Sequence, residues 1–236
     1  TESASKGDVL FNELLFNPYP GDPDYIEFIN VSGKILDASG LQVVYINESS
    51  DTSNLYLLSD EIRCIMPGSF FTITADISKT IERYPATGSQ FLFERSLPVM
   101  SDEEGHLVLL NKSLEKIDEV FYSDDMHNSL LSGTEGISLE KINPDYESAI
   151  PRNWYSASGS IGWGTPGAPN SVFSDTLVSG SMVKLSSTKI TPDNDGFEDF
   201  VIIRIQSPGI ENVVSATVFD ESGRFVKRIA SNLLSG

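Results

Sequence analysis

The stretch that decides the fold reads Asp8-Val9-Leu10-Phe11-Asn12-Glu13-Leu14, followed by Asp24-Tyr25-Ile26-Glu27-Phe28-Ile29-Asn30-Val31-Ser32. Both runs are mostly apolar; the first continues to Phe16 and is closed by the turn-forming residues 17–23, and the second stops at residues 30–33, which is typical of β-strands. Each run carries one glutamate, Glu13 or Glu27, among apolar neighbours. A buried ionised carboxylate needs hydrogen bonds or a charged partner. We therefore expect both glutamates either to bond backbone groups where strands cross or to pair with a basic residue.

The strand pattern continues along the first part of the chain. Short apolar runs, separated by Gly, Pro, Asn and Asp, predict further strands at residues 41–46, 55–58, 62–66, 70–75, 91–93, 107–110, 120–122 and 137–142. One segment, residues 77–84, predicts a short helix with Asp76 as its N-cap. Many short strands at such spacing indicate an all-β sandwich or barrel rather than alternating β-α units.

Three segments, in order, carry a resemblance to a known family. The first is the opening pair of runs, and the second is Ile35-Leu36-Asp37-Ala38-Ser39-Gly40-Leu41-Gln42-Val43. The third comprises Gly136-Ile137-Ser138-Leu139-Glu140-Lys141, Trp154 and Gly164-Thr165-Pro166-Gly167-Ala168-Pro169-Asn170. Together they resemble the lamin tail domain family, although Leu41 stands where that family commonly has Trp. The resemblance implies an immunoglobulin-like β-sandwich over residues 1–170. Pro166 and Pro169 predict an extended closing segment that protects a sheet edge.

A second unit follows a predicted linker at residues 171–182. Strands are predicted at 183–185, 200–205, 215–219 and 225–229, with a tight turn at 221–223. Residues 191–200 and 218–226 resemble the immunoglobulin-like domain of flagellar hook-capping proteins and of bacterial surface-protein C-termini, with Asp193 in place of the usual Asn. Residues 183–236 hold fewer strands than the seven of a complete domain, so we expect a partial immunoglobulin-like domain.

Charge and composition exclude several classes of function. The formal net charge is −18, from 34 acidic and 16 basic residues, and such a surface repels phosphate backbones. We therefore expect no nucleic-acid binding, although some lamin tails are reported to show it. No apolar run approaches the roughly 20 residues that span a bilayer, and no signal peptide is visible. The single cysteine, Cys64, excludes an intrachain disulfide, and its apolar neighbours predict a buried strand position.

An acidic loop is the sharpest candidate for a metal site. Asp193, Asp195 and Asp199 have a spacing similar to that of calcium loops, in which carboxylates converge around a glycine turn. In the matching register, however, Ile202 occupies the twelfth position and cannot supply the bidentate carboxylate. The favoured interpretation is therefore a turn entering a strand, with calcium as the alternative.

The sequence predicts neither a catalytic nor a cofactor-binding residue. It contains no Gly-x-Ser-x-Gly and no glycine-rich phosphate loop. His127 follows Ser123-Asp124-Asp125-Met126, where mixed ligands could hold a metal, but a solvated acidic loop is the favoured interpretation. His106 is expected on a surface turn. We therefore expect a protein that is not an enzyme.

The resemblance implies a structural, adhesive or partner-binding module of a larger bacterial cell-surface or secreted protein. The alternative is an accessory domain of an exported nuclease or phosphoesterase whose catalytic domain lies elsewhere. The expected partner is a protein or a glycan, because exposed aromatic side chains are enriched at binding hot spots. The candidate anchors are Tyr19, Tyr25, Trp154, Tyr155 and Trp163.

Overall fold

The computed structural model describes residues 1–46, 52–85, 88, 91–128, 131–174, 182–193, 195–196, 198–206 and 212–235. Residues 175–181 of the predicted linker, and Asn194 and Phe197 of the acidic loop, lie outside this description. The chain divides into two compact units, one of Thr1–Asp175 with Glu221–Arg224 and the other of Thr176–Asp220 with Phe225–Gly236.

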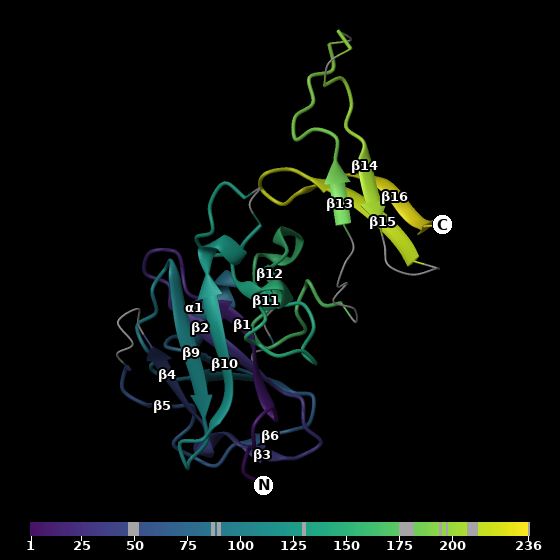
Figure 1. Ribbon diagram of the computed structural model, residues 1–236. Helices are drawn as coiled ribbons and strands as arrows, with labels where there is room; N and C mark the ends of the chain where they lie inside the picture. Colours follow the sequence, from purple (N-terminus) through teal and green to yellow (C-terminus); the bar gives the residue numbers. More distant parts are fainter. Residues whose placement is uncertain are drawn as a thin grey trace. The chain divides into compact units, whose positions relative to one another are not determined.

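Two larger sheets and one two-stranded sheet are described in the first unit (Figure 1). The larger has the order β12 (Trp154–Ser156), β11 (Leu139–Lys141), β1 (Val9–Leu15), β2 (Tyr25–Asn30), β7 (Phe70–Thr74) and β8 (Leu92–Glu94). The smaller has the order β10 (Lys116–Ser123), β9 (Glu104–Leu110), β4 (Gln42–Ile46) and β5 (Tyr56–Leu57). All these pairings are antiparallel except that of β7 with β8. A two-stranded sheet of β3 (Leu36–Asp37) and β6 (Cys64–Ile65) completes the unit.

The core of this unit draws side chains from both sheets. The six-stranded sheet contributes Phe11, Leu14, Ile26, Phe28, Phe71, Ile73 and Leu139, and the four-stranded sheet contributes Val43, Leu107, Leu109, Val120 and Tyr122. The ring of Phe28 lies 5.0 Å from that of Phe11 and 5.1 Å from that of Phe71. Since alternate residues of a strand point to opposite faces, this core takes every second residue of β2 and leaves Tyr25 and Glu27 on the other face.

A β-bulge in β1 sets which residues share that other face. The register with β2 shifts between Phe11 and Glu13, so Phe11 and Leu14 both reach the core although they are three residues apart. Asn12 and Glu13 consequently both lie on the face away from the core. The backbone N–H of Phe11 donates across to the carboxylate of Asp118 in β10, 2.8 Å away. The bulge therefore brings two polar residues together and also ties the two sheets to each other.

The short helices are few and local. The α-helix α1 (Ile77–Arg83) begins at Asp76, whose side chain accepts from the Lys79 N–H, so the predicted helix and its N-cap are confirmed. Single 3-10 turns are η1 (Ala38–Gly40), η3 (Asp124–Met126), η4 (Pro151–Asn153) and η5 (Gly159–Ile161). None of the described helices is long and apolar enough to cross a membrane.

The second unit consists of two strand pairs. β13 (Met182–Leu185) pairs with β14 (Ile203–Gln206), and β15 (Asn212–Phe219) pairs with β16 (Phe225–Ser235), both antiparallel. Many apolar side chains of this unit are exposed, among them Val183, Leu185, Phe200, Phe219, Phe225 and Val226. The strands expected from the sequence are present here, although β14 begins three residues later than predicted.

The mostly-β architecture predicted from the sequence is confirmed, with three local differences. The short strands β3 and β12 were not predicted. The prediction that Cys64 is buried is wrong: Cys64 is exposed, and its neighbour Ile65 is the buried residue of β6. Alternation along a strand allows only one of two consecutive residues to face the core.

Replacing Phe28 tests the core. Phe28→Ala removes a fully buried ring between two others and is expected to lower the free energy of unfolding by about 3–5 kcal/mol. Chemical denaturation of both variants measures the change. Phe121→Ala, at a half-exposed ring on β10, is the matched control and should cost about 1 kcal/mol or less. Equal losses would contradict this placement of the core.

Candidate functional site

A row of polar side chains crosses the six-stranded sheet on the face away from the core. Glu13 of β1 is the register partner of both Glu140 in β11 and Glu27 in β2, and Glu27 is the partner of Thr72 in β7. All four side chains are fully buried. Three carboxyl groups thus lie on neighbouring strands, shielded from water.

The covering segment, residues 164–172, buries this row and supplies its hydrogen-bond donors. The backbone N–H of Thr165 donates to Glu13 at 2.8 Å, and the N–H of Gly167 donates to Glu27. Further along, the Val172 N–H and the Ser171 hydroxyl donate to Glu140 at 3.0 and 2.7 Å. Each carboxyl group therefore receives a backbone N–H from one short stretch of chain.

The sheet itself supplies the remaining donors. Glu13 accepts from the hydroxyls of Tyr25 and Ser138, each at 2.6 Å. Glu27 accepts from Thr72 at 2.7 Å and from the Asn12 amide at 2.8 Å. These contacts meet the requirement that buried carboxyl groups be hydrogen-bonded.

Two expectations for this region are answered by these contacts. Backbone bonding of Glu13 and Glu27 is confirmed, whereas neither glutamate is recorded with a basic partner among the described residues. The prediction that the Pro166–Pro169 stretch protects a sheet edge is wrong. The segment lies across β11, β1 and β2, which are inner strands, and turns at Pro166 and Gly167. The carboxyl groups in the middle of the sheet hold it there.

Burial raises the pKa of all three glutamates, because an ionised carboxylate is poorly solvated at such a site. The pKa of Glu13 is raised well above its usual value by burial and by the neighbouring charges of Glu140 and Glu27. Burial raises the pKa of Glu27 to about 7, although three hydrogen bonds oppose the shift. The pKa of Glu140 is also raised by burial.

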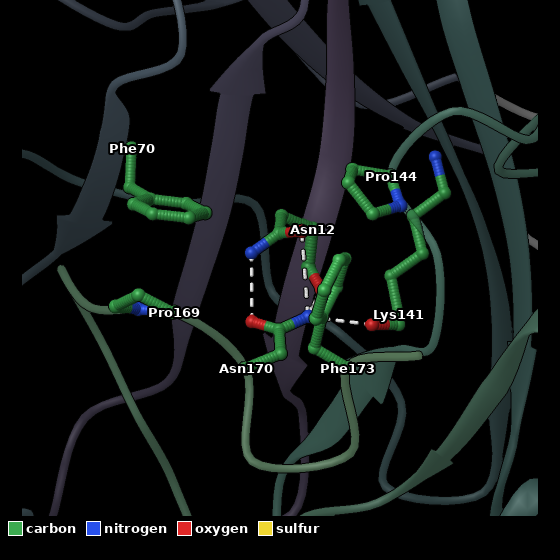
Figure 2. Close-up of a pocket in the computed structure, with 7 residues that line it drawn as sticks. All are labelled: Asn12, Phe70, Lys141, Pro144, Pro169, Asn170 and Phe173. Atoms are coloured by element: carbon green, nitrogen blue, oxygen red, sulfur yellow. Dashed lines mark hydrogen bonds between the residues drawn. The ribbon is translucent and has the colours of Figure 1, made fainter. Parts of the chain in front are cut away.

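A small pocket of about 200 Å³ opens beside the covering segment (Figure 2). Its walls are the rings of Phe70, Pro144, Pro169 and Phe173. Its polar part is a pair of facing amides: Asn12 Nδ2 donates to Asn170 Oδ1 at 2.8 Å, and Asn170 Nδ2 donates to the carbonyls of Asn12 and Lys141. Apolar walls with a few oriented polar groups are the usual form of a small binding pocket.

Lys141, whose backbone faces this pocket, has a fully buried side chain. Its ammonium donates to the Ser148 hydroxyl at 3.0 Å, and Ser148 in turn donates to Asp118. Burial lowers the pKa of Lys141 to about 8, while the charge of Asp118 opposes the shift. This Lys-Ser-Asp chain joins β11 to β10 through the loop that carries Ser148.

The five aromatic residues expected to be exposed anchors differ in their placement. The expectation is wrong for Tyr25 and Trp154, which are buried. The Tyr25 hydroxyl donates to Glu13, and the Trp154 indole N–H donates to the Ser148 carbonyl. Tyr155 is exposed on the edge strand β12, and Tyr19 and Trp163 are half-buried. The structure does not bring these five residues together into one surface.

Neither histidine lies where the sequence predicted. His127 is buried rather than in a solvated loop; its Nδ1 contacts the Ser156 hydroxyl at 2.9 Å, and its Nε2 has no hydrogen-bond partner among the described residues. Burial lowers the pKa of His127 to about 4. His106 lies inside β9 rather than on a turn, stacked on Phe121 with ring centroids 3.9 Å apart and bonded to Glu119.

The acidic loop brings its three aspartates together. Carboxylate oxygens of Asp193, Asp195 and Asp199 all lie within 4.8 Å of one another, on a surface that is mostly exposed. Asp193 accepts from the Asp195 N–H and Asp199 accepts from the Gly196 N–H, which are the bonds of the favoured turn interpretation. The geometry is thus compatible with both the turn and the calcium alternative.

Comparison with known proteins adds no family. The sequence matches no protein-family model, and no curated protein matches it significantly.

Several residues of this site were not predicted from the sequence. Glu140 lies between Leu139 and Lys141, and all three are fully buried, so alternation gave no sign that its carboxyl group joins Glu13 and Glu27. The side chain of Asn170 bonds Asn12, 158 residues away in the chain. Such contacts are set by strand register, which local patterns do not specify.

The turn of the covering segment depends on glycine at residue 167. Gly167 has φ +79°, and a Cβ there would lie 2.4 Å from the carbonyl oxygen of Gly88. Gly167→Ala is expected to lower the free energy of unfolding by about 1–3 kcal/mol or more, measured by denaturation. The control Gly33→Ala has open space around it and should change little. Full stability of the Gly167 variant would contradict the described turn.

The calcium alternative has a direct test. If the loop binds calcium, titration calorimetry should give binding in the millimolar range typical of weakly ligated extracellular sites, and calcium should raise the melting temperature. Asp195→Asn should abolish both effects, whereas Asp145→Asn in the first unit should change neither. Absence of heat and of any thermal shift at millimolar calcium leaves only the turn interpretation.

Proposed function

We propose that the chain is a non-catalytic, partner-binding module of a larger exported or cell-surface bacterial protein, built on a lamin-tail-type immunoglobulin-like sandwich. The observation that carries this proposal is the convergence of the resembling segments. Asn12 and Glu13, Glu27, Glu140 and the Thr165–Asn170 stretch come from separate parts of the sequence and meet in one hydrogen-bond network. Residues of the first and third resembling segments thus contact one another directly.

The binding role is supported by the pocket beside the covering segment. Phe173 is 53% exposed and forms a wall that could pack on an apolar side chain or on the face of a sugar ring. The facing amides leave carbonyl oxygens with spare acceptor capacity on its polar side. A protein or a glycan partner at the cell surface would therefore use this pocket. The net charge of −18 disfavours nucleic acid.

A non-catalytic role is supported by the pocket beside the covering segment, whose described lining contains neither a histidine nor a cysteine. The Ser156–His127 pair is buried, which keeps it from a substrate. We therefore infer that the chain binds a partner and does not catalyse a reaction.

Binding is tested with the 236-residue chain on arrays of bacterial and host glycans and of extracellular-matrix proteins. We expect retention of at least one glycan or protein, and Phe173→Ala should weaken it at least about tenfold, since an aromatic anchor contributes more than about 1 kcal/mol. Phe121→Ala, an exposed ring on β10, is the matched control and should bind as the wild type does.

Two outcomes would contradict the proposal. One is retention that Phe173→Ala leaves unchanged, which would remove the pocket from the interface. The other is hydrolysis of nucleic acid or phosphoesters by the purified chain, which would make it an enzyme.

A further inference from the structure

The Thr165 hydroxyl sits between two carboxyl groups. Its oxygen lies 3.1 Å from Glu13 Oε2 and 2.9 Å from Glu140 Oε1. A hydroxyl has one hydrogen and can donate to only one of these oxygens, whereas an ionised carboxylate only accepts. Both contacts are hydrogen bonds only if one of the two carboxyl groups carries a proton and donates it to the Thr165 oxygen.

The order of the carboxyl groups in the row identifies which one carries that proton. Glu13 and Glu140 each have one oxygen that accepts from other donors and one whose contact is the Thr165 hydroxyl. Both oxygens of Glu27 accept from donors other than a carboxyl group. Glu13 differs because it is the middle group, the register partner of both Glu140 and Glu27, so a proton on Glu13 removes the repulsion with both neighbours. Its Oε2 is therefore the position for the proton.

The charges around the row favour a neutral group. The titratable groups that face Glu13 are Glu140 from β11, Glu27 and Tyr25 from β2, and Tyr84 after α1. The covering segment contains no titratable side chain. Lys141, which follows Glu140 in β11, donates instead to Ser148. Three ionised carboxylates on adjacent buried strands would repel one another without compensation.

We propose that Glu13 is an un-ionised carboxylic acid at neutral pH, that it donates through the Thr165 hydroxyl to ionised Glu140, and that loss of this proton releases the covering segment from the sheet. The segment then acts as a latch that opens as pH rises. Opening would begin at Thr165 and Gly167, which bond the row directly, before the rest of the fold unfolds.

The direction of the pH effect follows from linkage. A glutamate that binds its proton more tightly when folded stabilises the fold at low pH, and this contribution falls as pH rises from about 4.5, the ordinary pKa of the side chain, through its raised pKa. His127, whose pKa is lowered, acts in the opposite direction between about 6.5 and 4. A comparison between two variants that both retain His127 cancels its effect.

The test compares the wild type with Glu13→Gln, whose amide reproduces the neutral acid: its oxygen accepts three donors and its NH₂ donates to Thr165. Carbon NMR of the glutamate side chains should show Glu13 un-ionised at pH 7 in the wild type. Hydrogen exchange should be measured from pH 6 to 9. In the wild type, the protection factors of the Thr165 and Gly167 amides should fall about tenfold per pH unit above the raised pKa of Glu13. In Glu13→Gln, the same protection factors should stay constant.

Glu82→Gln, at an exposed position on α1, is the matched control and should follow the wild type. Two results would overturn the proposal: a Glu13 carboxyl signal that is fully ionised at pH 6, or parallel loss of amide protection in wild type and Glu13→Gln. The NMR measurement on the wild type stands even if the substituted protein is unstable.

Discussion

The first unit depends on one constraint: carboxyl groups buried in the middle of a sheet must receive hydrogen bonds, and a sheet's own backbone cannot supply them. Most N–H groups of β1, β2 and β11 are engaged in pairing between strands, and the N–H of Phe11 at the bulge donates to Asp118 instead. The donors come instead from side chains of the sheet and from the covering segment, 152 residues from Glu13 at Thr165. A segment without repetitive structure is therefore fixed to the sheet by hydrogen bonds to its carboxyl groups.

This requirement organises the surroundings of the row. The bulge in β1 places Asn12 beside Glu13, where its amide links Glu27 to Asn170. The covering segment, once seated, contributes Pro169 and Asn170 to the pocket, and Phe173 follows directly. The pocket is thus a consequence of closing the sheet face. Its shape depends on contacts that lie under the segment, such as those of Gly167 with Glu27 and of Asn170 with Asn12.

The two units differ in the burial of their apolar side chains. The first buries a continuous core between two sheets, whereas many apolar residues of the second remain exposed in the described strands. Buried polar groups in the first unit are largely paired, and His127 Nε2 is the exception that the described residues show. The polar network and the apolar core therefore occupy opposite faces of one sheet, separated by the thickness of β1 and β2.

The sequence by itself determined the class of structure and most strand positions, because these follow from local alternation. It also determined α1 with its cap, which follows from capping chemistry, and the need of Glu13 and Glu27 for hydrogen bonds, which follows from the cost of burying charge. The tertiary structure alone decided that Glu140 joins them, that the proline-rich segment covers a sheet face, and that Tyr25 and Trp154 are buried while Cys64 is exposed. These depend on register and on contacts between distant residues, since a shift of one residue along a strand turns every side chain to the other face.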